Sequence, residues 1–253
     1  MNIALITGAS SGLGLEFAKQ IDNMSEEIDE IWLIARRKDR LISLAENLKH
    51  PVKILALNLM DEADIALLES KLKEEQPNIK FLVNSAGFGI LGYFEKSNIK
   101  EQLEMIQLNC SVLTQVTFLA LPYMKENSRI MQIASSAAFL PQRNFAVYAA
   151  SKSYVLSFSY GLGAELEKRK IYVTAVCPGP VQTEFFDRAE KNGSVLKIKQ
   201  FIMAKPDKVV KKALKDSLKR KGKSVYGAPI KYIEVISKLL PYKSLLFFMK
   251  FMK

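Results

Sequence analysis

Short runs of apolar residues recur along the chain and alternate with longer segments whose apolar residues are spaced as on one face of a helix. The short runs are continuously apolar and do not alternate with polar residues, which is typical of parallel strands buried on both faces. This order predicts an α/β fold, a doubly wound sheet of about seven parallel strands flanked by helices. The predicted strands are IALIT (3–7), EIWLIA (30–35), VKILALN (52–58), KFLVNSAG (80–87), RIMQIASS (129–136), IYVTAVCPG (171–179) and KSVYG (223–227). The predicted helices span 14–23, 37–48, 61–75, 99–124 and 148–168.

No linker, repeat or low-complexity segment divides this pattern, so residues 1–253 are expected to form one domain. With 253 residues, 49% of them hydrophobic, the chain can bury a full core. It contains no uncharged apolar run of about 18 residues, so no membrane-spanning segment is expected. The N-terminal MNIALITGAS is typical of a strand and not of a signal peptide, which predicts a cytoplasmic protein.

The residue types that most often bind metals give no metal-site pattern. Cys110 and Cys177 lie in apolar surroundings and match no metal-ligand spacing, which indicates buried free thiols in a reducing compartment. The single histidine, His50, precedes Pro51 in a polar loop and is interpreted as a solvated loop residue, not as a ligand or base. No metal site is predicted.

The net charge of +11 is concentrated near the C-terminus. Residues 191–253 hold 17 of the 37 Lys and Arg residues but only three of the 26 Asp and Glu residues, and this local excess argues against nucleic-acid binding. In the extension 230–253, apolar runs are broken by lysines and by Pro241, which excludes a spanning helix. We expect the extension to pack on a partner subunit or on its own domain, or to contact an anionic membrane surface peripherally.

The first predicted strand ends in TGASSGLG and continues directly into a helix. Glycines at this point allow a tight turn and a close approach of the backbone to a pyrophosphate, whose charge is met by the helix N-terminus. A purely structural turn is the alternative, but the position between the first strand and the first helix favours a dinucleotide site. The predicted cofactor contacts in this motif are Gly8, Ser10, Ser11, Gly12, Leu13 and Gly14.

The second predicted strand ends in IARRKDR. A carboxylate is expected here in an NAD site, because it accepts hydrogen bonds from the ribose hydroxyls. Arg36 and Arg37 occupy the position instead, and a guanidinium suits the 2′-phosphate of NADP(H). NADP(H) is therefore predicted as the cofactor, in preference to NAD(H). The alternative is a solvated basic start of the next helix.

The segment RNFAVYAASKSYV places Tyr148 and Lys152 four residues apart on one predicted helix, so that their side chains lie one turn above the other. Taken alone, such a pair indicates only an amphipathic helix. A tyrosine with a pKa of about 10 is a poor base at neutral pH, however, and a neighbouring cation stabilises its phenolate form. The pair is therefore a candidate for proton transfer.

In order along the chain, the motifs TGASSGLG, NSAG, QLN, IASS, YAASK and PGPVQT resemble those of the short-chain dehydrogenase/reductase family, over about residues 1–185. This resemblance implies a Rossmann fold and a catalytic set of Asn109, Ser135, Tyr148 and Lys152. Tyr148 would transfer the proton, Lys152 would also hold the nicotinamide ribose, Ser135 would orient the substrate oxygen and Asn109 would hold a relay water. Ser136 has the same chemistry as Ser135, which is preferred by its spacing to Tyr148.

The resemblance also implies cofactor contacts outside the glycine motif. Two positions depart from the family pattern: Asn58 stands where an aspartate is common, and Ser85 replaces the second asparagine of the usual pair. The loop CPGPVQT would embrace the nicotinamide amide, the alternative being a proline-stiffened turn. The further cofactor contacts implied are Asn58, Leu59, Asn84, Ala86, Gly87, Tyr148, Lys152, Pro178, Gly179, Val181 and Thr183.

Together these features predict an NADP(H)-dependent oxidoreductase that interconverts a carbonyl and a secondary alcohol, and the family also implies a homodimer or homotetramer. Residues 184–206 are predicted to form a mobile lid, whose apolar residues favour a small hydrophobic substrate such as a 3-oxoacyl, steroid or quinone-like carbonyl. The alternative is a non-catalytic NADP(H)-binding sensor or scaffold, because a fold alone does not fix a function. The predicted apolar lid residues are Phe185, Phe186, Val195, Leu196, Ile198, Phe201 and Ile202.

Overall fold

The computed structural model describes residues 1–253 without 25–26, 191–202, 242 and 245–253. In this part of the chain seven strands pair in one sheet, all parallel, in the order β3-β2-β1-β4-β5-β6-β7. The strand order reverses between β1 and β4, which is where a doubly wound sheet binds its ligand. The predicted fold class is confirmed. The strands are β1 (Asn2–Thr7), β2 (Glu30–Ile34), β3 (Val52–Leu55), β4 (Asn78–Asn84), β5 (Arg129–Ile133), β6 (Tyr172–Val176) and β7 (Lys223–Ser224).

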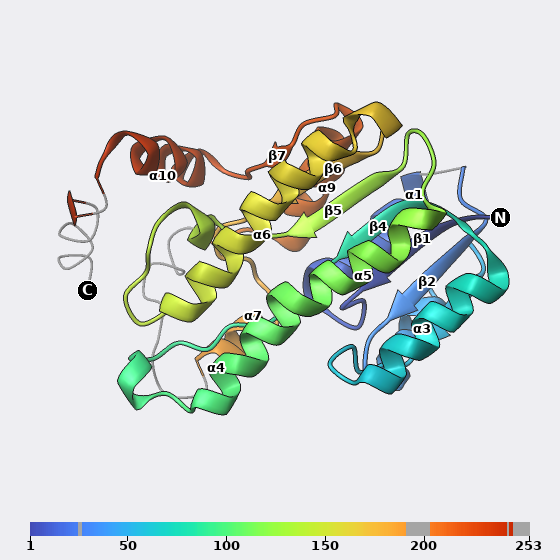
Figure 1. Ribbon diagram of the computed structural model, residues 1–253, viewed down its shortest axis with the longest axis horizontal. Coiled ribbons are helices and arrows are strands. Elements are labelled where there is room, and N and C mark those ends of the chain that lie inside the picture. Colours follow the sequence, from blue (N-terminus) through green and yellow to red (C-terminus); the bar gives the residue numbers. More distant parts are fainter. Residues whose placement is uncertain (25–26, 191–202, 242, 245–253) are drawn as a thin grey trace.

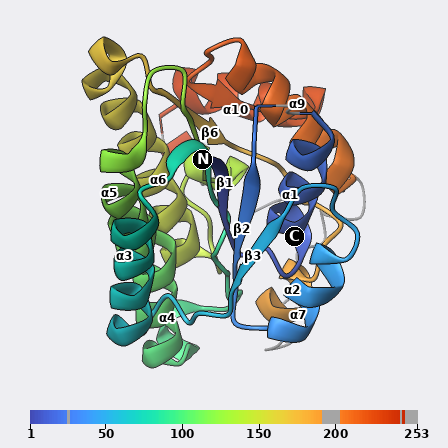
Figure 2. The ribbon, with the colours of Figure 1, turned by 90° about the vertical axis from the view of Figure 1, so that its right-hand side faces the viewer.

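Helices cover both faces of the sheet (Figure 1). Seen along the sheet in Figure 2, α3, α4, α5 and α6 lie on one side and α1, α2 and α9 on the other. Short helix α7 follows β6, and α10 lies beyond β7. The helices are α1 (Gly12–Met24), α2 (Lys38–Ala45), α3 (Glu62–Glu75), α4 (Ile99–Ile106), α5 (Leu113–Ala120), α6 (Ala146–Glu165), α7 (Phe185–Ala189), α9 (Pro206–Leu218) and α10 (Ala228–Leu239).

The central strand β1 shows why the apolar runs are continuous. Ile3 and Leu5 belong to the core between the sheet and α3, α5 and α6, whereas Ala4 and Ile6 belong to the core against α1, α2 and α9. All four side chains are fully buried. Successive side chains of a strand point to opposite faces, so a strand covered on both sides needs an apolar residue at every position.

The predicted helix at 99–124 is interrupted in the structure. Between α4 and α5, residues Gln107–Val112 form a π-helical turn, and a 3-10 turn at Leu121–Tyr123 ends the segment. A π turn adds one residue to the helical repeat and rotates the side chains that follow, and no apolar period in the sequence reveals it. The predicted strand KSVYG is also shorter than expected, since only Lys223 and Ser224 pair with β6.

The helical segment Ile99–Tyr123, with its π and 3-10 turns included, is long and apolar enough to cross a membrane by length and composition alone. In the structure 44% of its most apolar 18-residue window is buried, and α5 packs against β4 and α3. Packing on a sheet explains the same apolar composition in a core helix.

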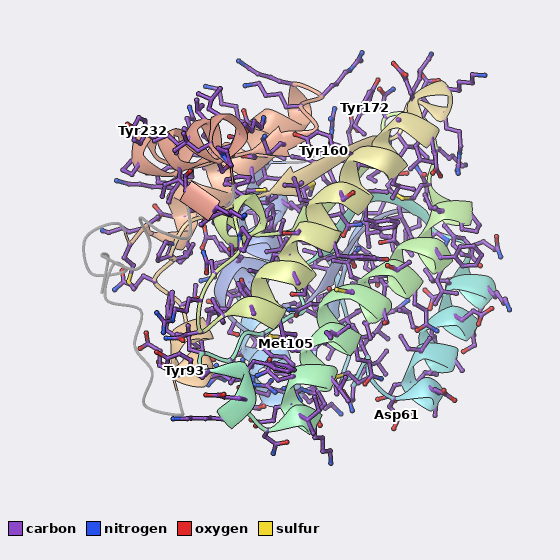
Figure 3. All side chains as sticks on the ribbon, turned by 60° about the vertical axis from the view of Figure 1, so that its left-hand side comes forward. Asp61, Tyr93, Met105, Tyr160, Tyr172 and Tyr232 are labelled. Carbon is purple, nitrogen blue, oxygen red and sulfur yellow. The ribbon has the colours of Figure 1, made fainter. Side chains whose placement is uncertain are left out.

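Helix α3 begins where the sequence predicts. Asp61 at the start of α3 (Figure 3) accepts a hydrogen bond on its side chain from the backbone N–H of Ala63, 2.9 Å away. A side-chain acceptor at this position satisfies a backbone donor that has no partner within the helix.

Two predicted segments lie only partly within the described residues. Of the predicted lid, 184–190 and 203–206 are described, while the apolar lid residues between 195 and 202 lie outside them. Near the end of this segment, Ala204 forms an isolated parallel bridge with Val181, outside the strands of the sheet. Of the extension 230–253, α10 and the residues up to 244, apart from 242, are described, and its apolar end at 245–252 lies outside.

A buried carboxylate on α1 fixes the loop before β3. Asp22 is 4% exposed, and its Oδ1 accepts the backbone N–H groups of Lys49 at 2.9 Å and His50 at 3.0 Å. The His50 ring Nδ1 lies 2.9 Å from the same oxygen. His50 is thus a partner of Asp22, and its interpretation as a solvated loop residue is wrong. Burial opposes ionisation of Asp22, but the hydrogen bonds from His50 and Lys49 outweigh it and hold the pKa of Asp22 below its usual value.

Asp22→Asn should therefore lower the free energy of unfolding at pH 7 by about 1–3 kcal/mol, because the charged acceptor is lost. A lowered pKa in the folded state stabilises the protein above the unfolded pKa of about 4, and this contribution disappears as the pH falls through the folded value. The difference from wild type should shrink accordingly below pH 4. Urea unfolding at pH 7 and pH 3.5 measures it, with the exposed Glu46→Gln as control. An equal difference at both pH values would contradict the role of the charge.

Candidate active site

A cavity of about 450 Å³ lies at the carboxyl ends of the strands, where the fold predicts a ligand. Its volume is within the range of small-molecule sites. Gly14, Asn84 and Asn109 are the predicted site residues that do not line it. The predicted residues that line it are Gly8, Ser10, Ser11, Gly12, Leu13, Arg36, Arg37, Asn58, Leu59, Ala86, Gly87, Ser135, Tyr148, Lys152, Pro178, Gly179, Val181 and Thr183.

The glycine turn after β1 approaches other backbone too closely for side chains. A Cβ at Gly8 would lie 2.7 Å from the backbone nitrogen of Ala86, and one at Gly14 would lie 2.4 Å from the carbonyl oxygen of Gly8. Gly8 and Gly12 also have φ values of +67° and +57°, which favour glycine. Gly14 therefore packs behind the turn, while Gly12 and Leu13, in the first turn of α1, line the cavity. The first N–H groups of an α-helix have no partner within the helix, so this turn offers donors to a ligand.

The side chain of Thr7 joins the glycine turn to the loop after β4. Its Oγ1 accepts the backbone N–H groups of Ser85 at 3.1 Å and Ala86 at 3.2 Å. Ser85 is thus held through its backbone, so the loop keeps its tie although the usual second asparagine is missing. Asn84 points elsewhere: its Nδ2 donates to Thr117 Oγ1 at 2.9 Å in a buried contact with α5.

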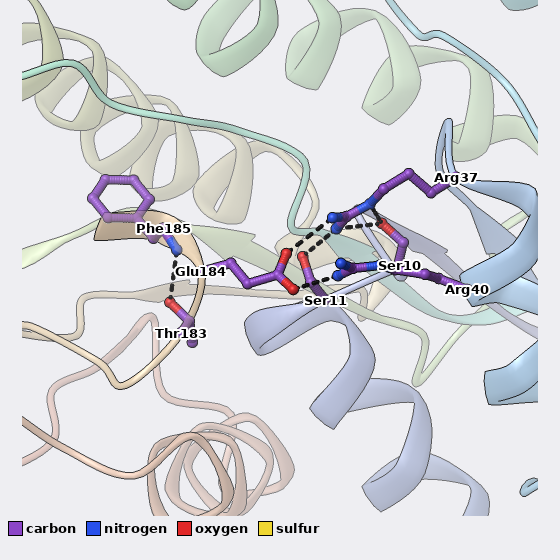
Figure 4. Close-up of polar contacts among 7 residues, drawn as sticks. All are labelled: Ser10, Ser11, Arg37, Arg40, Thr183, Glu184 and Phe185. Atoms are coloured by element: carbon purple, nitrogen blue, oxygen red, sulfur yellow. Dashed lines mark hydrogen bonds and ion pairs between the residues drawn. The ribbon is translucent and has the colours of Figure 1, made fainter. Parts of the chain in front are cut away.

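Arg37 lies over the hydroxyls of the glycine turn (Figure 4). Its Nη2 donates to Ser10 Oγ at 3.1 Å and to Ser11 Oγ at 2.9 Å. Its Nη1 donates to the carboxylate of Glu184, 2.9 Å away, and Arg40 pairs with the other oxygen of that carboxylate. From the sequence, Glu184 is expected only as part of the lid, and no motif points to Arg40 as a site residue.

Asn58 lies in the loop that follows β3 and lines the cavity, as Arg36 does. Its backbone N–H donates to Asp64 Oδ2 at 2.7 Å, and its own Oδ1 accepts weakly from the backbone N–H of Met60 at 3.4 Å. Asp64, in the first turn of α3, therefore fixes the loop that carries Asn58 and Leu59. An acidic first turn is a common helix signal and gave no reason to select Asp64 as a site residue.

Helix α6 presents Tyr148 and Lys152 to the cavity from one face, as their spacing predicts. The Tyr148 ring stacks on Phe145 with centroids 4.2 Å apart and meets Phe185 of α7 at 5.4 Å. Lys152 is 5% exposed, and its Nζ donates to the carbonyl oxygen of Ile133 at 2.7 Å. That nitrogen lies 5.7 Å from the centroid of the Tyr148 ring.

Burial acts on these two side chains in the same sense, because it favours the neutral form of each. It raises the pKa of the Tyr148 phenol to about 12, although a hydrogen bond with the Ser135 side chain acts against the shift. It lowers the pKa of Lys152 to about 8, while the nearby thiols of Cys110 and Cys177 act in the opposite direction. At neutral pH the phenol therefore carries its proton and the lysine is mostly charged.

Ser135 lies where β5 turns into a short 3-10 helix (Ser136–Phe139). Its Oγ accepts the backbone N–H of Ala137 at 3.1 Å, which fixes the hydroxyl beside Tyr148. The backbone N–H of Ser136 donates to Pro178 at 2.8 Å and joins this loop to the one after β6. Both serines line the cavity, and the hydroxyl bonded to Tyr148 belongs to Ser135.

Asn109 lies in the π-helical turn and is fully buried behind the cavity wall. Its Oδ1 accepts the backbone N–H of Phe88 at 3.0 Å, and its Nδ2 donates to the carbonyl of Phe88 at 2.9 Å and to Ser151 Oγ at 3.1 Å. A Cβ at Gly87 would lie 2.8 Å from Asn109 Oδ1 and 3.6 Å from Lys152 Nζ. Asn109 thus joins the loop after β4 to α6 by hydrogen bonds to Phe88 and Ser151.

The loop after β6 closes the other side of the cavity. A Cβ at Gly179 would lie 2.5 Å from Ile230, so α10 packs directly against this loop. Thr183 lies directly against Gly12, since a Cβ built at Gly12 would lie 3.4 Å from the Thr183 side chain. Thr183 Oγ1 also accepts the backbone N–H of Phe185 at 3.4 Å, at the first turn of α7 (Figure 4).

Two further residues of the cavity region carried no sequence signal. Gly89 packs against aromatic rings, and a Cβ there would lie 2.7 Å from Phe145, 2.8 Å from Phe185 and 2.9 Å from Tyr148. Arg188 on α7 lines the cavity with its guanidinium 3.4 Å from the centroid of the Phe88 ring. Burial, and next the charge of Arg36, lower the pKa of Arg188.

The residues of this cavity fit a dinucleotide. The turn at Gly8 and Gly14 leaves no room for side chains of its own, and the open N-terminus of α1 suits a pyrophosphate. The guanidinium of Arg37 and the hydroxyls of Ser10 and Ser11 offer donors at one end, and Lys152 offers a cation at the other. Among the residues described, no cluster of three or more His, Cys, Asp or Glu side chains could hold a metal ion.

Comparisons with known proteins agree with this geometry. An uncharacterized oxidoreductase of Staphylococcus epidermidis is 30% identical over 72% of this chain and 78% of its own length. Sulfoacetaldehyde reductase 2 of Chromohalobacter salexigens is 33% identical over 73% of this chain and 74% of its own. A short-chain dehydrogenase from Sphingobium yanoikuyae, solved in complex with NADPH, is 30% identical and aligns over 89% of this chain and 87% of its own with a TM-score of 0.78.

The sequence model of the short chain dehydrogenase family matches residues 2–193, which include every motif named above. The match stops before α9, β7 and α10. The chain therefore belongs to the short-chain dehydrogenase/reductase family of NAD(P)-dependent oxidoreductases.

Proposed function

We propose that this oxidoreductase uses NADP(H) to interconvert a carbonyl and a secondary alcohol on a hydrophobic substrate, with Tyr148 as the proton-transfer residue. The observation that carries the proposal is the arrangement of Tyr148, its Ser135 hydrogen bond and Lys152 in one cavity with the glycine turn. A non-catalytic sensor or scaffold would need the glycine turn but not the other three side chains. Their common location favours the enzyme.

Each catalytic side chain has a distinct task in this proposal. Tyr148 gives its proton to the carbonyl oxygen or takes one from the alcohol, and Ser135 donates a hydrogen bond that orients that oxygen. Lys152, mostly charged at neutral pH, stabilises the phenolate when Tyr148 has lost its proton. Asn109 would act through the loop that it clamps and through any water held beside it.

The residues that would hold the cofactor extend along the whole cavity. The glycine turn would bind the pyrophosphate, Asn58 the adenine, and Lys152 the nicotinamide ribose. When bound, the nicotinamide would supply or accept the hydride that the protein cannot. The backbone from Pro178 to Thr183 would flank the nicotinamide amide.

Two observations support NADP(H) over NAD(H). Arg36 and Arg37 follow β2, where an NAD site has a carboxylate, and Arg37 lies over Ser10 and Ser11. The solved relative from Sphingobium yanoikuyae binds NADPH. A guanidinium and two hydroxyls are the kind of groups that bind a 2′-phosphate.

The catalytic end of the cavity supports a hydrophobic substrate. Phe145 and Phe185 flank the Tyr148 ring, and Phe88 and Phe186 add further aromatic lining. Helix α7 would serve as the first part of the predicted lid, because Thr183 and the bridge between Val181 and Ala204 fix its base. A 3-oxoacyl, steroid or quinone-like carbonyl fits this lining.

Helix α10 supports the proposals of self-association and of peripheral membrane contact. Tyr232 (Figure 3), Val235 and Leu239 are 68%, 54% and 75% exposed and lie on one face, since they are three and four residues apart. Lys231 and Lys238 are on the same helix. An exposed apolar stripe of this kind marks a contact surface, and we propose a second subunit as its partner.

Tyr148→Phe should lower kcat by about 10²–10⁴-fold with a panel of hydrophobic ketones, because only the proton-transfer hydroxyl is removed. The dissociation constant of NADPH should change little. Tyr154→Phe is the matched control, since Tyr154 is on the same helix and its hydroxyl bonds Thr114 outside the cavity. Retention of most of the kcat by Tyr148→Phe would refute the assigned mechanism.

The rate should also follow the charge of Lys152. Its pKa of about 8 means that the ammonium is present below that pH and is lost above it, whereas Tyr148, at about 12, stays protonated throughout. Because kcat/KM for NADPH depends on ionisations of the free enzyme, it should fall as the pH rises above about 8. Initial rates from pH 6 to pH 10 measure this, with NADPH affinity recorded at each pH. If kcat/KM did not change across this pH range, the hypothesis that the reaction requires a charged Lys152 would be wrong.

Replacing Tyr232 and Leu239 together with serine should shift the protein to a smaller species in size-exclusion chromatography with light scattering. Ile42→Ser, a substitution of an exposed apolar residue on α2, should leave the mass unchanged. If the wild type is monomeric and co-sediments with anionic liposomes, and the double variant does not, the stripe contacts a membrane and the proposed subunit contact is wrong.

A further inference from the structure

Glu184 is the acidic group that meets the arginines after β2. One carboxylate oxygen lies 2.9 Å from Arg37 Nη1, and the other pairs with Arg40 Nη1. The contact joins residues 147 positions apart in the chain, from the loop after β6 to the start of α2. Figure 4 shows the carboxylate beside both guanidinium groups and bonded to each, with Ser11 close to it and Ser10 on the other side of the Arg37 guanidinium.

The donors of Arg37 are already used in this arrangement. Its Nε and Nη2 face the hydroxyl of Ser10, Nη2 also faces Ser11, and Nη1 faces Glu184. A phosphate needs the same fork of N–H donors that a carboxylate needs. A 2′-phosphate in reach of Ser10 and Ser11 would therefore compete with Glu184 for Arg37, and for Arg40 beside it.

The contact is also weak enough to be exchanged. The side chains of Arg37 and Glu184 are 42% and 45% exposed, and ion pairs with this exposure contribute little to stability because water and salt screen them. A phosphate carries more charge and more acceptor oxygens than a carboxylate. Replacing the Glu184 carboxylate by a phosphate on Arg37 is thus favourable, but the loss of the Glu184 contact reduces the net free energy of phosphate binding.

We propose that Glu184 is an internal competitor for the 2′-phosphate, which occupies Arg37 and Arg40 until NADP(H) displaces it. Glu184 thereby reduces the preference for NADP(H) below what the two arginines alone would give, without acting on NAD(H). The inference rests on the proposed use of NADP(H). The alternative is that Glu184 orients the arginines for the phosphate. When the carboxylate is neutralised, competition predicts a higher affinity for the 2′-phosphate and orientation predicts a lower one.

The experiment compares binding of 2′,5′-ADP and 5′-AMP, which differ only in the 2′-phosphate, by isothermal titration calorimetry with the full chain. Glu184→Gln keeps the size of the side chain and removes its charge. We expect about two- to fivefold tighter binding of 2′,5′-ADP than in wild type, the size of an exposed ion pair, and unchanged binding of 5′-AMP. Asp187→Asn, at an exposed position in α7, the helix that directly follows Glu184, removes the same charge and should leave both affinities unchanged.

The outcomes separate this inference from the proposed cofactor. If the wild type binds 2′,5′-ADP no more tightly than 5′-AMP, the NADP(H) preference itself is wrong. If the wild type prefers 2′,5′-ADP and Glu184→Gln leaves that preference unchanged or weakens it, the cofactor proposal stands and the competition is refuted. Tighter binding of 2′,5′-ADP by Asp187→Asn to the same degree would also refute it, because the effect would then be one of net charge.

Discussion

The whole site depends on backbone segments that lie too close together to admit a side chain. Gly8 lies against Ala86, and Gly14 against Gly8 itself, so the turn after β1, the loop after β4 and the first turn of α1 form one unit. Gly87 extends that unit to Asn109 and Lys152. The glycine turn and the surroundings of Lys152 thus rest on neighbouring contacts, and a methyl group at Gly8 or Gly14 would force the backbone apart.

The close packing around these glycines has an electrostatic cost. Close packing buries Tyr148 and Lys152, and burial favours the neutral form of each, with pKa values of about 12 and about 8. Proton transfer requires the opposite pair, a phenolate beside an ammonium. The polar contacts offset part of the burial, through the Ser135 hydroxyl on Tyr148 and the Ile133 carbonyl on Lys152. The rest of the cost of burying charge is offset when the ammonium of Lys152 stabilises the phenolate of Tyr148. This requires the two side chains to lie on one face of α6.

The fold was readable from the sequence because a sheet covered on both faces imposes continuous apolar strands, as Ile3–Ile6 show. Tyr148, Lys152 and the glycine turn were readable because their chemistry depends on local spacing. Contacts between segments far apart in the sequence could not be predicted in this way. Nothing local connects Glu184 to Arg37, or His50 to Asp22. The π turn that directs Asn109 onto the backbone of Phe88 is likewise set by packing and leaves no apolar period to detect.

Two neighbouring residues link the ends of the cavity. Glu184 contacts the arginines at the end where the adenosine 2′-position would lie, and Phe185 packs on the ring of Tyr148 at the catalytic end. Thr183 holds the turn between them, and the bridge from Val181 to Ala204 fixes its base. Contacts at the two ends of the cavity therefore depend on the placement of one short backbone segment, residues 183–185, which lies outside the strands of the sheet.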